Sequence, residues 1–161
     1  SIWMEVRLAV FKFRLQTLLR LKKQLEKNAK NELGIAVMKL EEEKAKLRAI
    51  EHNIDLTMSD FRKACQGIIQ PEKIKELKVF LEYLQTERER QEVNVKRQQE
   101  NVDKIREKLV EIMKERKVLE NLKEKEYQEY LKTEEKKEQQ RVDELVSYNE
   151  SKKIPELLEG R

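Results

Sequence analysis

Side chains that could act as nucleophiles or metal ligands are scarce in this sequence. His52 is the single histidine and Cys65 the single cysteine, so these residue types cannot complete a zinc site or an internal disulfide. We expect His52 to be exposed in mid-helix and Cys65 to be a packed or surface thiol beside a turn. No glycine-rich phosphate loop or nucleophile elbow occurs. The sequence predicts no catalytic residues, no metal and no cofactor.

Charged side chains are abundant, making up 42% of the residues, but they are mixed along the chain, as in Glu124-Lys125-Glu126. Acid–base catalysis needs a carboxyl group whose pKa has been raised by burial. On a slender helical protein the carboxylates face water and form i,i+4 pairs. The basic runs Arg20-Leu21-Lys22-Lys23 and Arg88-Glu89-Arg90 have acids nearby, so the net charge of +4 is a weak signal for nucleic-acid binding. We expect that the protein does not bind nucleic acid and is not an enzyme.

Helix breakers are few: 161 residues include three Gly and two Pro. This predicts few, long elements, and a mean hydropathy of −0.89 leaves only a narrow apolar seam to bury. No run approaches the roughly 18 apolar residues that span a bilayer, and no signal-peptide pattern is present. We expect a soluble, cytoplasmic, all-α protein of two long helices.

The second half of the chain shows the clearest heptad pattern, in which apolar residues fall about 3.5 residues apart at coiled-coil a and d positions. Four polar residues interrupt it. The series is Ile74, Leu77, Leu81, Leu84, Arg88, Gln91, Val95, Gln98, Val102, Ile105, Leu109, Ile112, Arg116 and Leu119.

The first half shows the same pattern in two frames. The four-residue step between Ala29 and Leu33 predicts a stutter, an insertion that locally relaxes the supercoil. Gly34 lies in this step and should weaken the helix there further. The upstream frame is Leu15, Leu18, Lys22, Leu25 and Ala29. The downstream frame is Leu33, Ala36, Leu40, Glu43, Leu47, Ile50, Ile54, Thr57, Phe61 and Ala64.

Gly67 and Pro71 punctuate the segment between the two halves. Glycine suits the left-handed residue that ends a helix, and proline suits the first residue of the next one. We therefore predict a single-domain, monomeric, long two-helix antiparallel coiled-coil hairpin over residues 1–161. Its first helix covers about 5–66, its turn 67–71, its second helix about 72–147, and a loose tail containing Pro155 covers 148–161.

The two frames mesh in an antiparallel pair when facing residue numbers sum to about 138. Leu33 then faces Ile105, and Phe61 faces Leu77. In the middle of the hairpin apolar residues face polar ones, which lowers stability but fixes register. These pairs are Leu40 with Gln98, Leu47 with Gln91, and Ile50 with Arg88.

In this register Leu8 lies beside Tyr130, so residues 131–146 project beyond the first helix. These residues have few apolar side chains at seam positions and many charged ones. A helix of this kind either frays or is stabilised by a partner.

Three segments carry a resemblance to a known family. Residues 11–22, FKFRLQTLLRLK, resemble the opening of the FliJ family of bacterial flagellar type III export. Residues 78–84, KVFLEYL, look like the family's aromatic-rich segment, and residues 142–145, VDEL, look like its acidic C-terminal element. The resemblance covers about residues 8–147. Met4 would be a natural start, in which case residues 1–3 come from outside the native chain.

The resemblance implies a non-enzymatic part of the export apparatus, located in the bacterial cytoplasm and peripheral at the cytoplasmic face of the inner membrane. Members of the family resemble the γ stalk of rotary F-type ATPases. The partners it implies are the hexameric export ATPase FliI, whose ring assembly they promote, the cytoplasmic domain of the export gate FlhA, and flagellar export chaperones.

Two contact sites are implied by the same resemblance. The family's export-gate patch matches Phe80 and Leu84, while Glu87 and Gln91 stand where the family has a small residue and a histidine. Leu84 is also a seam residue. The ATPase contact is expected at the terminal end, with the candidates Phe13, Arg14, Leu131, Glu138, Arg141, Val142, Asp143, Glu144 and Leu145.

Two other functions fit the heptads. A structural segment of a longer filament, tether or SMC-like arm would show the same repeat, although its heptads should run to both ends without an aromatic opening or unequal arms. A nucleic-acid-binding hairpin would require binding that weakens steeply with salt.

Overall fold

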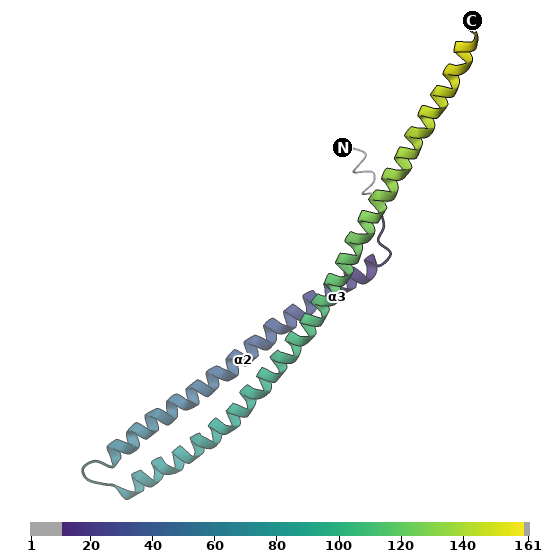
Figure 1. The fold of residues 1–161 in the computed structure, drawn as a ribbon. Helices are drawn as coiled ribbons and strands as arrows, with labels where there is room; N and C mark the ends of the chain where they lie inside the picture. The colour runs from purple at the N-terminus through teal and green to yellow at the C-terminus, as the bar shows by residue number, and fades with distance from the viewer. Residues whose placement is uncertain (1–10, 160–161) are drawn as a thin grey trace. The chain divides into compact units, whose positions relative to one another are not determined.

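The computed structural model describes the backbone of residues 11–159 and the side chains of residues 11–153. Two helices account for most of it: α2 spans Gln16–Ala64 and α3 spans Pro71–Glu159. They run in opposite directions and pack against each other, and residues 11–159 contain no strand (Figure 1). The predicted all-α helical hairpin is confirmed.

Contacts divide the chain into two compact units, which are described one at a time. The terminal unit combines the residues up to Lys23 with those from Lys114 onward, and the turn unit runs from Gln24 to Met113. The single-domain assignment stays a prediction.

The start of α2 lies later in the chain than the sequence suggested. The first helix was predicted from about residue 5; residues 1–10 lie outside the described part, and residues 11–15 are not helical. The Gln16 N–H donates to the Phe13 carbonyl oxygen at 3.1 Å in a turn that precedes α2. Residues two apart share a side in an extended segment but not on a helix. This backbone therefore lets Phe11 and Phe13 both pack on α3.

The end of α3 also differs from the prediction, because the helix continues to Glu159. Past residue 147, the Ser151 hydroxyl donates to the Tyr148 carbonyl oxygen at 2.9 Å, and Lys152 Nζ lies 4.7 Å from the centre of the Tyr148 ring. The contact between Lys152 and Tyr148, four residues apart, is of the kind that favours helix. The helix therefore includes residues 148–159, which the sequence pattern assigned to a loose tail; the looseness of this tail stays a prediction, and residues 160–161 lie outside the described part.

The turn between the helices covers residues 65–70, close to the predicted 67–71. Gly67 has a φ of 74°, a left-handed conformation that costs residues with a Cβ about 1 kcal/mol or more. The Cys65 N–H donates to the Phe61 carbonyl oxygen at 3.1 Å, which completes the end of α2. Pro71 opens α3, where its missing N–H has no helical partner to lose.

The core of the turn unit is a thin seam between α2 and α3. One cluster joins Ala29 to Leu109 and Ile112, and the next joins Ala36 and Leu40 to Val102; Leu33 packs against both. Ala29 with Leu109, Leu33 with Ile105, and Ala36 with Val102 each fit the predicted register. Small alanines on α2 opposite larger residues on α3 let the backbones approach closely.

The predicted stutter is wrong. Leu25 is 36% exposed, whereas Glu26 is only 7% exposed. Glu26, Ala29, Leu33 and Ala36 continue the downstream frame without a shift. A single heptad frame keeps the helices in contact, and Lys30, whose Nζ lies 3.2 Å from Glu26 Oε1, offsets part of the cost of burying that carboxylate.

Polar residues occupy the seam where the sequence placed them. Gln91 is buried at 8% exposure, and Arg88 and Gln98 are half-buried. Gln98 Oε1 has no hydrogen-bond partner among the described residues. The lower stability expected here stays a prediction.

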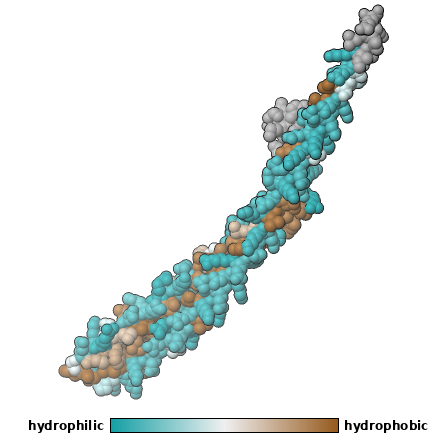
Figure 2. Space-filling model, viewed as in Figure 1, coloured by the Kyte–Doolittle hydropathy of each residue, from teal (hydrophilic) through white to brown (hydrophobic). Residues whose placement is uncertain are grey.

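The outer surface is mostly hydrophilic on the face that Figure 2 shows, and one of the groups of hydrophobic residues on that face lies at the turn. Ile68 is 95% exposed and Ile69 55% exposed there. Neither described helix combines the length and the apolar character that a membrane span requires.

Candidate functional site

The four export-gate candidates lie on α3 in the turn unit but do not form one exposed surface. Phe80 is 46% exposed, whereas Leu84 and Gln91 are buried in the seam. Glu87 is half-buried, and its Oε1 accepts a hydrogen bond from Arg90 Nη1 at 3.0 Å. Of these four candidates, only Phe80 offers a partner a large apolar contact area.

The neighbours of Phe80 make up the exposed surface that the sequence match missed. Val79 is 59% exposed and Tyr83 57% exposed, and the rings of Phe80 and Tyr83 stack with centroids 6.2 Å apart. Together with Glu72, Lys75 and Glu76 these residues line a shallow hollow. We call Val79, Phe80 and Tyr83 the aromatic patch. Their positions off the heptad seam are the sequence signal that identifies them.

Gln91 has a structural role that the resemblance did not indicate. Its Nε2 donates to the Glu43 backbone oxygen at 3.0 Å and also to the Glu43 carboxylate. The hydrogen bond from Gln91 holds the pKa of Glu43 below its usual value; burial opposes the shift, and Lys46, 3.3 Å away, adds to it. A side chain engaged in this way is not free to bind a partner while the two helices are paired.

The terminal unit has its own small core. Phe13, Leu19 and Leu119 are buried together, with Phe11, Leu15 and Leu122 packed against them. Phe11 also contacts two tyrosines of α3, with ring centroids 5.2 Å from Tyr127 and 5.4 Å from Tyr130. The aromatic opening of the chain is thus an anchor that attaches the N-terminal segment to α3.

The ATPase candidates fall into two separate groups. Phe13 is buried in the core, and the Nε of the exposed Arg14 lies 3.5 Å from Glu126 Oε1. Leu131 is half-buried near the last aromatic contact. Because α3 rises about 1.5 Å per residue, Val142 lies roughly 35 Å along the helix from Leu119. The structure does not bring the two groups together.

The C-terminal group lies on a stretch of α3 that has no helical partner among the described residues. Every described side chain from Glu135 to Lys153 is exposed, and Figure 1 shows this part of α3 extending past the start of α2. We call residues 135–153 the lone stretch of α3. Its candidates are Glu138, Arg141, Val142, Asp143, Glu144 and Leu145.

An apolar stripe follows one face of the lone stretch. Val142 is 48% exposed, Leu145 60% and Val146 50%, and their i, i+3, i+4 spacing puts them on the same face of a helix. Asp143, outside the stripe, accepts a hydrogen bond from Gln139 Nε2 at 3.1 Å. The stripe can contact a partner's apolar side chains while the charged faces meet its polar ones.

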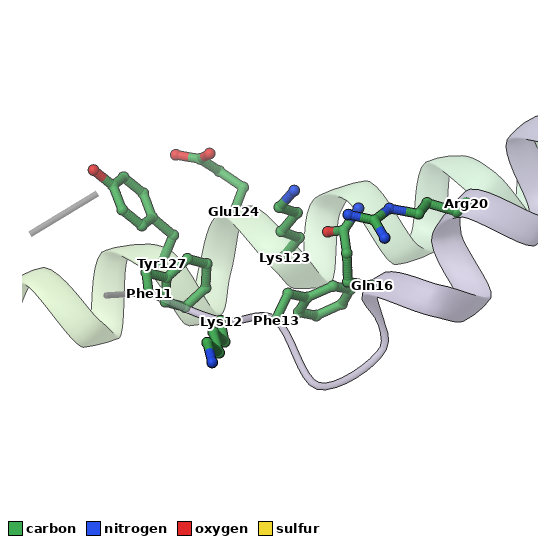
Figure 3. Close-up of a pocket in the computed structure, with 8 residues that line it drawn as sticks. All are labelled: Phe11, Lys12, Phe13, Gln16, Arg20, Lys123, Glu124 and Tyr127. Atoms are coloured by element: carbon green, nitrogen blue, oxygen red, sulfur yellow. The ribbon is translucent and has the colours of Figure 1, made fainter. Parts of the chain in front are cut away.

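A hollow of about 570 Å³ lies in the terminal unit, where residues 11–20 meet α3 (Figure 3). Sequence reasoning did not identify it, although its aromatic residues belong to the opening segment. We call it the N-terminal hollow. It is lined by Phe11, Lys12, Phe13, Gln16, Arg20, Lys123, Glu124 and Tyr127.

Comparison with known proteins gives one match. A family model described as "FliJ: Flagellar FliJ protein" matches residues 11–153, from the aromatic anchor through the turn to the end of the lone stretch. No curated protein and no solved structure matches the chain.

Proposed function

The chain belongs to the FliJ family of flagellar proteins, and on that premise we propose that it is a stalk-like component of the bacterial flagellar type III export apparatus. In this role it binds the hexameric export ATPase FliI and promotes assembly of its ring. It also couples the ring to the cytoplasmic domain of the export gate FlhA and to export chaperones, at the cytoplasmic face of the inner membrane.

The lone stretch of α3 is the observation that carries the ATPase contact. A polar helix without a packed face is only marginally stable by itself, yet residues 135–153 continue α3 with every side chain exposed. A narrow pore lined on all sides can contact such a helix around its whole circumference. The stripe of Val142, Leu145 and Val146 supplies the apolar part of that contact.

The aromatic patch supports the export-gate contact. Val79, Phe80 and Tyr83 are each between 46% and 59% exposed, and exposed aromatic clusters are typical of protein interfaces. The patch lies in the turn unit and the lone stretch in the terminal unit. The two partners therefore have different surfaces to bind.

The family match argues against a fragment of a longer filament, because it includes the aromatic opening and the lone stretch as well as the heptads. A filament segment is expected to bind neither the ATPase nor the export gate.

Truncation after Leu131 tests the ATPase contact. The truncated protein keeps the terminal core of Phe13, Leu19 and Leu119, so circular dichroism should show a folded hairpin. Ring assembly by the ATPase, followed by light scattering or mass photometry, should lose its stimulation. Truncation after Lys153, which leaves the lone stretch intact, is the matched control and should stimulate normally. Full stimulation by the shorter protein would locate the contact elsewhere.

A further inference from the structure

The N-terminal hollow combines an aromatic floor with a charged rim. Phe13 is 6% exposed and fixed in the terminal core. Phe11 packs against Tyr127 of α3, with the two ring planes tilted by 59°. In Figure 3 Lys12 lies below Phe11, Lys123 extends upward from α3 above Phe13, and Arg20 lies on the right beside Gln16. A rigid apolar floor of this size suits one bulky apolar side chain of a ligand.

The cations of the rim lack an anionic partner in the part of the chain that the structure describes. Among the residues that the structure describes, Lys12, Arg20 and Lys123 form no hydrogen bond or ion pair through their side chains. Other cations of the terminal unit have acidic partners. Lys22 forms an ion pair with Glu115, Lys23 lies 3.9 Å from Glu120, and Arg116 donates a hydrogen bond to Glu120 at 2.8 Å.

Glu124 is the single acid among the described residues that line the hollow, and it does not neutralise the rim. Glu124 accepts a hydrogen bond from Gln128 Nε2 at 2.9 Å, on its own helix. Three cations against this one carboxylate leave a formal excess of two positive charges. The preceding residues 1–10 supply one acid, Glu5, and one base, Arg7, so they cannot balance that excess.

We infer that the N-terminal hollow binds an acidic segment of a partner protein, with an apolar side chain on the aromatic floor and flanking carboxylates at Lys12, Arg20 and Lys123. The inference rests on the proposed function, since it takes this partner to be the export ATPase and assigns a chemistry to one of its contacts. Carboxylates on both sides of the apolar anchor would match the positions of the cations on both sides of the floor.

Nucleic acid fits the hollow less well. Glu124 lies among the cations, so a nucleic-acid backbone with a charge at every residue would meet it, whereas a peptide can place its uncharged residue beside Glu124 and its carboxylates at the cations.

Charge reversal in the reconstituted complex with the ATPase tests the inference. The double variant Arg20→Glu, Lys123→Glu should bind at least about tenfold more weakly, a loss that lower salt does not restore. The variant Arg20→Lys, Lys123→Arg should bind nearly as the wild type. Lys117→Glu with Lys132→Glu makes the same change in net charge at two exposed positions of α3 outside the hollow. This control should weaken binding by less than about threefold. Circular dichroism checks that all variants are folded.

A cross-link identifies the partner segment. Benzoylphenylalanine in place of Gln16, on the wall of the hollow, should attach on illumination to an ATPase peptide rich in Asp and Glu, found by mass spectrometry. Wild-type affinity in the charge-reversed variant, or attachment to a neutral or basic peptide, would overturn the inference and leave the proposed function standing. Absence of ATPase binding by the wild type would overturn both. Competition for the hollow by a single-stranded DNA oligonucleotide or by anionic phosphatidylglycerol vesicles, lost in the charge-reversed variant, would reassign it to those ligands and overturn the peptide assignment.

Discussion

Gln91 of α3 donates hydrogen bonds from its Nε2 to both the backbone oxygen and the carboxylate of Glu43 of α2. In addition to the ion pair of Lys108 with Glu32, this side chain joins the two helices of the turn unit by polar contacts at the seam. A buried polar pair of this kind favours one register, because a slipped pairing would leave both groups without partners.

Acid should weaken the turn unit through this pair. The pKa of Glu43 in the folded protein lies below its ordinary value of 4.5. The stabilisation is therefore full above pH 4.5 and is lost as the pH falls through the lower, folded-state pKa. We expect Gln91→Leu to reduce the drop in melting temperature between about pH 6 and pH 3, measured by circular dichroism. Gln98→Leu, which removes an unsatisfied acceptor, should leave the pH dependence unchanged. An equal acid response in both variants would show that other carboxylates dominate.

The corrected heptad frame predicts different costs for two adjacent leucines. Leu19 is 1% exposed and Leu18 is 39% exposed. Leu19→Ala should lower the free energy of unfolding by about 2–4 kcal/mol, because it opens a cavity in the terminal core. Leu18→Ala should cost less than about 1 kcal/mol. Urea unfolding measures both. A larger loss for Leu18→Ala would restore the stutter that the sequence suggested.

Substitutions at Phe80 and at Leu84 should differ in their effects on export-gate binding. Phe80→Ala with Tyr83→Ala removes the exposed rings of the aromatic patch, so binding to the cytoplasmic domain of FlhA should weaken at least about tenfold while the melting temperature changes little. Leu84, 5% exposed, belongs to the seam, and Leu84→Ala should mainly lower the stability. Val93→Ala, a 55% exposed residue on the same helix, is the control for binding. Calorimetry and thermal melts distinguish the two effects, and unchanged affinity without the two rings would exclude the aromatic patch.

The apolar stripe of the lone stretch makes a further prediction. Val142→Asp with Leu145→Asp should leave the helix content unchanged, since both side chains are exposed, but should strongly reduce stimulation of ATPase ring assembly. Gln140→Asp with Ser147→Asp adds the same two charges on the opposite face of the helix. This control should retain most of the stimulation. If both variants lose it equally, the contact depends on total charge and not on the stripe.

Much of the fold could be predicted from the sequence, because heptads, one glycine and one proline specify two helices and the turn between them. The register followed from the same pattern, as the packing of Ala36 against Val102 shows. The frame before Ala29 was mispredicted because Leu25 is more hydrophobic than Glu26. Continuity of the seam outweighed that difference, with Lys30 beside the buried carboxylate.

The sites were less predictable, since they depend on contacts between distant residues. The non-helical Phe11 and Phe13 are stabilised by α3, which no local propensity reports. Whether Arg20 or Lys123 has an acidic neighbour is likewise set by packing. The heptad register did indicate most of the lone stretch, because it left residues 131–146 beyond the first helix. The aromatic patch could also have been found from heptad positions, because Val79, Phe80 and Tyr83 all fall outside the seam.

The turn at residues 65–70 also makes the pairing of α2 with α3 an intramolecular step. Ile68 is 95% exposed, so the turn adds little packing of its own, and its contribution is to keep one helix within reach of the other. A short linker of this kind gives its ends an effective concentration in the millimolar range. A single proteolytic cut here would change a unimolecular pairing into a bimolecular one. The melting temperature of the chain cut at this turn would then rise with protein concentration, whereas that of the intact chain would not.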